Sequence, residues 1–175
     1  MIKFLVVVDM QNDFIDGSLG TPEAVAIVDN VVSKIKNTDA IVIATRDTHF
    51  EDYLKTAEGQ KLPVEHCIKG THGWKINSAV KEALRDVEYV DIINKKTFGS
   101  VELPKAIASM SKGQDFSVEL IGLCTDICVV SNALLLKAHF PDKAISVDSS
   151  CCAGVTPETH EAALTTMRMC QIDVI

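Results

Sequence analysis

The sequence predicts an α/β fold in which a mostly parallel, six-stranded sheet lies between two layers of helices, a three-layer α/β/α, Rossmann-like arrangement. Short apolar runs rich in β-branched residues alternate along the chain with amphipathic stretches of helical spacing. The runs are nearly continuous in apolar residues, as expected for strands that are covered on both faces. The chain has 175 residues, 47% of them hydrophobic, which is enough for a proper core. We therefore expect one domain over residues 1–175.

The N-terminal third begins this alternation. The run KFLVVVD, residues 3–9, predicts a buried strand. Residues 21–37 predict a helix, because Thr21 suits an N-cap, Pro22 suits the first helical position, and apolar residues then recur at helical spacing. The run AIVIATRD, residues 40–47, predicts a second buried strand.

A long polar excursion separates this part from the rest. Residues 48–77 contain His, Gly and Pro, and loops of this length are usually functional or disordered. The alternation then resumes, with strands expected at 88–95, 115–123, 143–150 and 172–175, and helices at 77–87, 102–112, 126–139 and 156–170. Asn77 or Ser78 suits the start of the first of these helices, and a Thr-Pro pair suits the start of the last.

Charge and composition exclude several classes of partner. The net charge is −7 and the basic residues are scattered, so neither nucleic acid nor an anionic membrane is an expected partner. The N-terminal apolar run is too short to span a membrane and lacks a signal-peptide cleavage site. We expect a cytoplasmic protein whose six cysteines are reduced.

Polar residues follow the ends of the predicted strands. Ligands of open α/β sheets bind outside the carboxyl ends of the strands. In chain order, the residues at these ends are Asp9, then Asp47 and His49, then Lys95, then Cys124 and Cys128, and finally Asp148. Each alone could cap a turn or lie in solvent. Their coincidence at one edge of a sheet favours a catalytic site.

The two cysteines of GLCTDICVV have different surroundings. Cys128 falls in the first turn of the predicted helix, where free amide donors and the helix dipole favour a thiolate. A lysine such as Lys95 would lower the thiol pKa further. Asp9 could take up and return the proton, and backbone N–H groups of the turn could hold an oxyanion. Cys124 precedes the helix and gains less from the dipole.

Other readings of this pair fit less well. A redox motif has two intervening residues, whereas CTDIC has three. A zinc site needs two further ligands, and Cys151 and Cys152 are adjacent, so their side chains rarely reach one ion together. A binding module without chemistry is a third alternative, but no glycine-rich phosphate loop follows the first strand. Cys128 as a nucleophile is the hypothesis that we prefer.

Six segments, taken together and in this order, form a specific pattern. They are VVVDMQNDF (6–14), ATRDTHF (44–50), PVEHCIKGTHGW (63–74), NKKTFGS (94–100), IGLCTDICV (121–129) and VDSSCCAGVTPETHEAAL (147–164). The pattern resembles the isochorismatase-like cysteine hydrolases, and within them the nicotinamidase-related branch, over nearly the whole chain. The resemblance implies the isochorismatase-like hydrolase fold and a homo-oligomer.

The resemblance also implies an Asp-Lys-Cys triad. Its members fall on Asp9, Lys95 and Cys128, and Lys95 is preferred to Lys96 because it stands three residues before Phe98. The family carries a cis peptide that would fall between residues 123 and 124. The backbone N–H of Cys124 would then join that of Cys128 in an oxyanion hole.

A divalent metal is a further implication of the resemblance. Its ligands fall on Asp47, His49 and His66, which suit one zinc, iron or manganese ion per chain. The fourth position carries His or Glu in the family. Glu58 is our choice although it falls one residue from the expected spacing, and Glu51 and Asp52 are its rivals.

The expected substrate is a small amide. Phe14 is in place as one wall of the substrate site, but Pro63 stands where nicotinamidases often carry an aromatic residue, so Trp74 or Tyr53 would supply the second wall. The resemblance implies a metal-assisted amidohydrolase, with nicotinamide to nicotinate plus ammonia as the first candidate reaction. Alternatives are a carbamoyl, ureido or isochorismate-like substrate, and the metal ligands argue against the last because enol-ether cleavage needs no metal. Asp148 and His160 also match the family, and we assign them structural roles.

Overall fold

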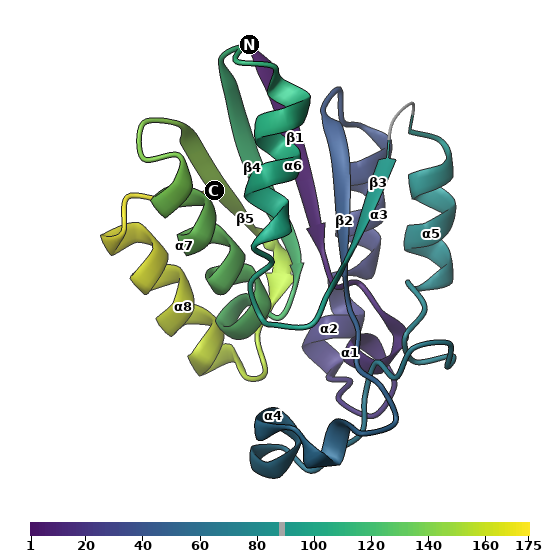
Figure 1. The fold of residues 1–175 in the computed structure, drawn as a ribbon. Helices are drawn as coiled ribbons and strands as arrows, with labels where there is room; N and C mark the ends of the chain where they lie inside the picture. The colour runs from purple at the N-terminus through teal and green to yellow at the C-terminus, as the bar shows by residue number, and fades with distance from the viewer. Residues whose placement is uncertain (88–89) are drawn as a thin grey trace.

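A parallel sheet forms the centre of the protein (Figure 1). The computed structural model describes residues 1–87 and 90–175. Within them the strand order is β3-β2-β1-β4-β5-β6, and every neighbouring pair is parallel. The strands are β1 (Ile2–Val8), β2 (Ile41–Asp47), β3 (Val90–Lys95), β4 (Phe116–Leu123), β5 (Ala144–Ala153) and β6 (Asp173–Val174). The predicted fold class is confirmed, and the first two residues of the strand expected at 88–95 lie outside the described residues.

Helices cover both faces of this sheet. The chain-order helices are α1 (Asn12–Ile15), α2 (Pro22–Ala26), α3 (Val28–Lys36), α4 (Ala57–Lys61), α5 (Ser78–Arg85), α6 (Glu102–Ser111), α7 (Val130–His139) and α8 (Pro157–Met169), with short η1 (Tyr53–Lys55) and η2 (Thr125–Val129) turns. Apolar residues of α2, α3 and α5 form one core with the sheet, and those of α6, α7 and α8 form the other. Among the described residues, no helix has both the length and the apolar character needed to cross a bilayer.

The structure confirms the capping residues predicted for three helix starts. The side chains of Thr21, Asn77 and Thr156 each accept a backbone N–H of the helix that follows, as their residue types predict. The helix expected over 21–37 is divided at Ile27 into α2 and α3. The helix expected over 126–139 begins with the π-helical turn η2, so Cys128 does lie in its first turn.

The position of Asp148 corrects one expectation. Strand β5 continues to Ala153, so Asp148 lies within the strand and not beyond its carboxyl end. Its carboxylate accepts hydrogen bonds from Lys34 on α3, at 2.9 Å, and from the Ser150 hydroxyl, at 2.7 Å. Burial raises the pKa of Asp148, but these hydrogen bonds and the Lys34 charge outweigh it and hold the pKa below its usual value. Asp148 therefore braces α3 against the sheet.

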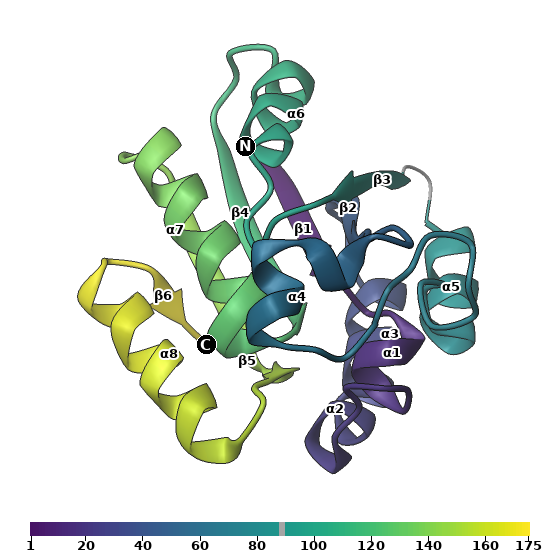
Figure 2. The same cartoon turned by 60° about the horizontal axis from the view of Figure 1, so that its bottom comes forward.

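The strand order reverses between β1 and β4, which is where a sheet of this order forms a ligand crevice. The two strands approach closely at their carboxyl ends, because Gly122 pairs with Val8 and has φ +115°. A Cβ on Gly122 would lie 2.1 Å from the Val8 carbonyl oxygen. Figure 2 looks onto this edge, where α4 from the long excursion lies across the strand ends.

Candidate active site

Asp9, Lys95 and Cys128 meet at the carboxyl-end edge of the sheet. The Lys95 ammonium lies 2.6 Å from Asp9 Oδ2 and donates to Cys128 Sγ at 3.3 Å. All three side chains are buried. Asp9 follows β1 with a positive φ of 46°, a conformation that Asp tolerates better than most residues, and its Oδ1 accepts the Thr45 hydroxyl at 2.7 Å. An acid, a cation and a thiol that are far apart in sequence are thus in direct contact.

The pKa of the Cys128 thiol differs from the expectation. Burial and the nearby Asp9 carboxylate raise the pKa of Cys128 well above its ordinary value, and the Lys95 charge opposes them only in part. Burial also raises the pKa of Asp9, against the effect of Lys95. The prediction of a lowered thiol pKa was wrong, because the sequence did not show how deeply the sulfur is buried. Both Asp9 and Cys128 therefore hold a proton more tightly than usual, and the Lys95 ammonium contacts each of them.

The turn that carries the sulfur is held by its own backbone. The peptide bond between Leu123 and Cys124 is cis, as the resemblance implies. The Cys124 carbonyl oxygen accepts N–H groups from Ile127 and Val129, at 3.1 and 3.0 Å. Burial raises the pKa of the Cys124 thiol to about 12, so this second thiol stays protonated at neutral pH. Within the described residues Cys124 makes no hydrogen bond to Lys95 or Asp9, whereas Cys128 accepts one from Lys95.

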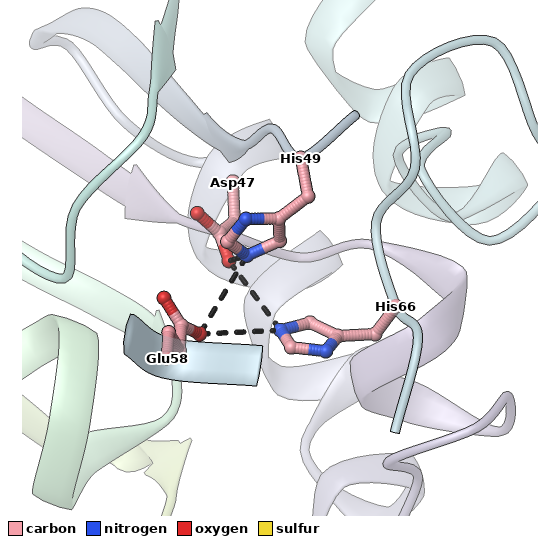
Figure 3. A group of neighbouring side chains, drawn as sticks. All are labelled: Asp47, His49, Glu58 and His66. Carbon is pink, nitrogen blue, oxygen red and sulfur yellow. Dashed lines mark hydrogen bonds and ion pairs between the residues drawn. The ribbon is translucent and has the colours of Figure 1, made fainter. Parts of the chain in front are cut away.

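Four further side chains form a second polar group (Figure 3). One ligand atom from each of Asp47, His49, Glu58 and His66 lies within 4.8 Å of the others. Asp47 also connects the two groups, because its Oδ1 is 3.3 Å from the Lys95 ammonium. Glu58 reaches the group from α4, with Oε1 3.6 Å from Nε2 of both histidines.

This donor set fits a divalent metal ion. Two imidazoles and two carboxylates are ligands of zinc, iron and manganese, and four converging donors in a buried place match such a site. Burial lowers the pKa of His66, but the Glu58 carboxylate and the Val64 carbonyl raise it above its usual value overall. A cation at His66 Nε2 would replace the proton that the Glu58 carboxylate favours, while Nδ1 would keep its hydrogen bond to the Val64 carbonyl. Of the three acids considered for the fourth position, Glu58 belongs to the group, whereas Glu51 and Asp52 are exposed and outside it.

Two supporting side chains were not singled out from the sequence. Gln11 is fully buried, accepts the Asp47 N–H at 2.6 Å and donates to the Asp47 carbonyl at 2.9 Å. Asp13 accepts the Cys67 N–H at 2.7 Å, next to His66. Both belong to the segment VVVDMQNDF that carries the resemblance. The available signal was the position of Gln11, two residues after the acid that ends the first strand.

A cavity of about 420 Å³ opens above both groups. Its lining is mainly apolar and includes Phe14, Leu19, Leu62, Phe98 and Ile127. Polar or reactive residues that also line it include Cys128, Cys124, Asp47, Glu58, His66, Lys61 and Lys96. Phe14 therefore lies where a substrate wall was expected. The volume is in the range of sites for small organic ligands.

The expected positions of Tyr53 and Trp74 need correction, because neither lines this cavity. Tyr53 is completely buried behind the histidines, with its ring 4.7 Å from that of His49 and its hydroxyl donating to the Leu62 carbonyl. Trp74 donates to the Thr48 hydroxyl and lies under the guanidinium of Arg46. Phe98, from the loop after β3, is the aromatic residue that accompanies Phe14 in the wall.

Comparison with known families agrees with this arrangement. A family model for the isochorismatase domain matches residues 3–175. The chain belongs to the isochorismatase family. The matched residues include Asp9, Lys95 and Cys128 as well as the neighbouring group of Asp47, His49, Glu58 and His66.

Three solved structures resemble the chain over nearly its whole length. Nicotinamidase/pyrazinamidase PncA from Bacillus subtilis is 26% identical, with a TM-score of 0.83 and 99% of each chain covered. Pyrazinamidase of Pyrococcus horikoshii, solved in complex with zinc, is 26% identical with a TM-score of 0.80, covering 100% of this chain and 99% of that one. N-carbamoylsarcosine amidase from Thermoplasma acidophilum is 28% identical with a TM-score of 0.76, covering 99% and 95%.

Proposed function

We propose that this protein is a metal-assisted cysteine amidohydrolase that hydrolyses a small amide, with nicotinamide to nicotinate plus ammonia as the first candidate reaction. Its family and its amidase relatives indicate an enzyme that cleaves a carbon–nitrogen bond. The observation that carries the proposal is the direct contact of Asp9, Lys95 and Cys128 under an apolar cavity. We also propose that residues 1–175 act as one domain, in a cytoplasmic homo-oligomer.

The first half of the reaction forms a thioester. Asp9 accepts the proton of the Cys128 thiol, and the sulfur attacks the amide carbonyl carbon. Lys95 stabilises the thiolate as the proton leaves, because its ammonium already donates to Sγ. The N–H groups of Cys124 and Cys128 hold the oxyanion. The carbon–nitrogen bond then breaks, and Asp9 gives its proton to the departing ammonia.

The second half consumes water. Asp9, again a carboxylate, takes a proton from a water molecule whose oxygen attacks the thioester carbon. The carbon–sulfur bond breaks and the acid leaves, while the sulfur recovers the proton. The raised pKa of both Asp9 and Cys128 suits this cycle, since a proton that neither group releases readily to solvent is passed between them.

The metal would be held by Asp47, His49, Glu58 and His66. When bound, a zinc, iron or manganese ion supplies a Lewis acid and a point of attachment for a substrate heteroatom. The chain itself orients this group, because Gln11 fixes the Asp47 backbone and α4 brings Glu58 over the strand ends.

A carbamoyl substrate is the second candidate. Pro63 stands where the family often has an aromatic residue, and Tyr53 and Trp74 do not replace it in the cavity wall. The similarity to N-carbamoylsarcosine amidase supports this alternative. The same triad chemistry would act on either substrate.

The test is ammonia release from nicotinamide, pyrazinamide and an N-carbamoyl amino acid. We expect Cys128→Ala to abolish release from whichever compound is the best substrate. Cys124→Ala is the matched control and should retain most activity, because only its backbone is used. Undiminished hydrolysis by the Cys128 variant would exclude the proposed nucleophile.

A further inference from the structure

His160 contacts the turn that carries Cys128, η2 (Thr125–Val129), from outside the cavity. It lies on α8, and a hydrogen bond of 2.8 Å joins its Nδ1 to the hydroxyl of Thr125. Thr125 is completely buried and stands directly after Cys124 and three residues before Cys128. The proposed chemistry gives His160 no part, and it does not line the cavity. Any effect on the reaction must therefore pass through Thr125.

A second contact ties the same turn to the same region. The two carboxylate oxygens of Asp126 accept the Val155 N–H, at 3.2 and 3.1 Å. Val155 precedes α8, whose start is fixed by a capping box between Thr156 and Thr159. Two successive residues of the turn are thus bound to this region, Thr125 to α8 itself and Asp126 to the segment before it.

The packing between β5 and α8 leaves little freedom at this contact. A Cβ on Gly154 would lie 2.9 Å from the His160 backbone nitrogen and 3.0 Å from its Cα. The strand end and the first turns of α8 therefore touch at their backbones. The part of α8 that carries His160 cannot shift without moving the end of β5.

The turn itself needs such support. It is a π-helical turn, a rare form that is common at functional sites. A buried hydroxyl without a partner costs about 1–3 kcal/mol, so Thr125 is stable in this orientation only while its partner remains. Rotation of the Thr125 peptide would displace the neighbouring backbone N–H of Cys124 and, through the turn, Cys128.

We infer that His160 is a positioning residue for the amidase reaction. Through Thr125 it keeps the oxyanion-binding N–H groups and the Cys128 sulfur in their places relative to one another. The inference rests on the proposed function. It predicts that loss of the hydrogen bond lowers kcat and leaves KM nearly unchanged, because the walls of the cavity are not involved.

The experiment compares His160→Ala with His160→Asn, whose side-chain amide places a polar atom where Nδ1 lies. We expect kcat to fall about ten- to hundredfold in the alanine variant, since small displacements of a reacting group can cost about a hundredfold. KM should stay within about threefold, and the asparagine variant should recover most of the rate. Glu161→Ala, at an exposed position of the same helix, is the control and should behave as the unchanged protein.

A double-mutant cycle separates positioning from general stability. Thr125→Val should lower kcat as His160→Ala does, and the double variant should be no slower than either single variant, because one hydrogen bond is removed in each. Thermal melting is recorded for all variants. Should the alanine variant fail to fold, the comparison uses Thr125→Val with Thr125→Ser, which retains the hydroxyl.

The results distinguish the inference from the proposed function. A variant that melts earlier but keeps its kcat, or that raises KM alone, would show a structural role and overturn the inference. The rate of Cys128 alkylation by iodoacetamide gives a second readout, which we expect to change in His160→Ala and to recover in His160→Asn. If no amide is hydrolysed by the unchanged protein, the proposed function fails, and equal alkylation rates in all variants would then overturn the positioning role as well.

Discussion

Replacement of Lys95 by methionine tests the electrostatics of the candidate site most directly. Methionine keeps a similar length and apolar stem but removes the only ammonium that contacts both Asp9 and Cys128 among the described residues. The change leaves Asp9 and Asp47 as neighbouring carboxylates without that cation, and the thiolate formed during the reaction loses its hydrogen-bond donor.

The structure sets the size of the effect. Two unit charges 3.3 Å apart, the separation of the Lys95 ammonium and Cys128 Sγ, attract by about 5 kcal/mol at an effective dielectric constant of ~20. Part of this is offset because the same ammonium also stabilises Asp9 before the proton moves. We therefore expect kcat/KM to fall by about a thousandfold, which corresponds to roughly 4 kcal/mol. Breaking a buried ion pair should also lower the free energy of unfolding by about 3–5 kcal/mol.

The assay measures ammonia release on the best substrate together with circular dichroism and thermal melting. Lys105→Met is the matched control, because Lys105 is exposed on α6 and does not line the cavity, and we expect its kcat/KM to stay within a few-fold of the unchanged protein. A folded Lys95→Met protein with unchanged kcat/KM would refute the reasoning. So would a larger loss in the Lys105 variant.

Three further predictions concern the metal group, the sheet and α3. Glu58→Ala should lower bound divalent metal, measured by elemental analysis after reconstitution with zinc or manganese, whereas Asp52→Ala should not; equal metal content would exclude Glu58 as a ligand. Gly122→Ala should destabilise the fold by roughly 3 kcal/mol or more in urea unfolding, because a Cβ would clash with backbone, whereas Gly113→Ala, also at positive φ but in open space, should cost only about 1 kcal/mol. The folded pKa of Asp148 is depressed, so its contribution to stability is present above the unfolded pKa of about 3.9 and is lost as pH falls through the lower folded value. The stability gap between the unchanged protein and Asp148→Asn should therefore narrow below about pH 4, and a gap that is constant from neutral pH to pH 3 would contradict this.

The sequence by itself determined the elements and the edge at which chemistry gathers. Apolar runs and helix caps such as Thr21 and Thr156 are local signals, so strand and helix positions followed from them. Parallel strands end at one edge, and this rule alone brought Asp9, Lys95 and Cys128 together before any contact was known. The resemblance added the cis peptide before Cys124, which the structure contains.

Only the tertiary structure decided how the long excursion returns to this edge. Residues 48–77 have no periodic pattern, so Glu58 was chosen over Glu51 and Asp52 only through the resemblance, and the structure shows that α4 brings Glu58 beside the histidines. For the same reason Tyr53 was expected in a cavity wall but packs behind His49.

The pKa of Cys128 and the bond between His160 and Thr125 also depend on the folded state. A helix start favours a thiolate in any protein, but burial and the charge of Asp9 act through the whole surrounding structure, and here they raise the pKa. Residues 125 and 160 come together because α8 packs on the end of β5. Short segments of the chain determine the helices and strands. Desolvation and contacts between residues far apart in the sequence are properties of the packed molecule.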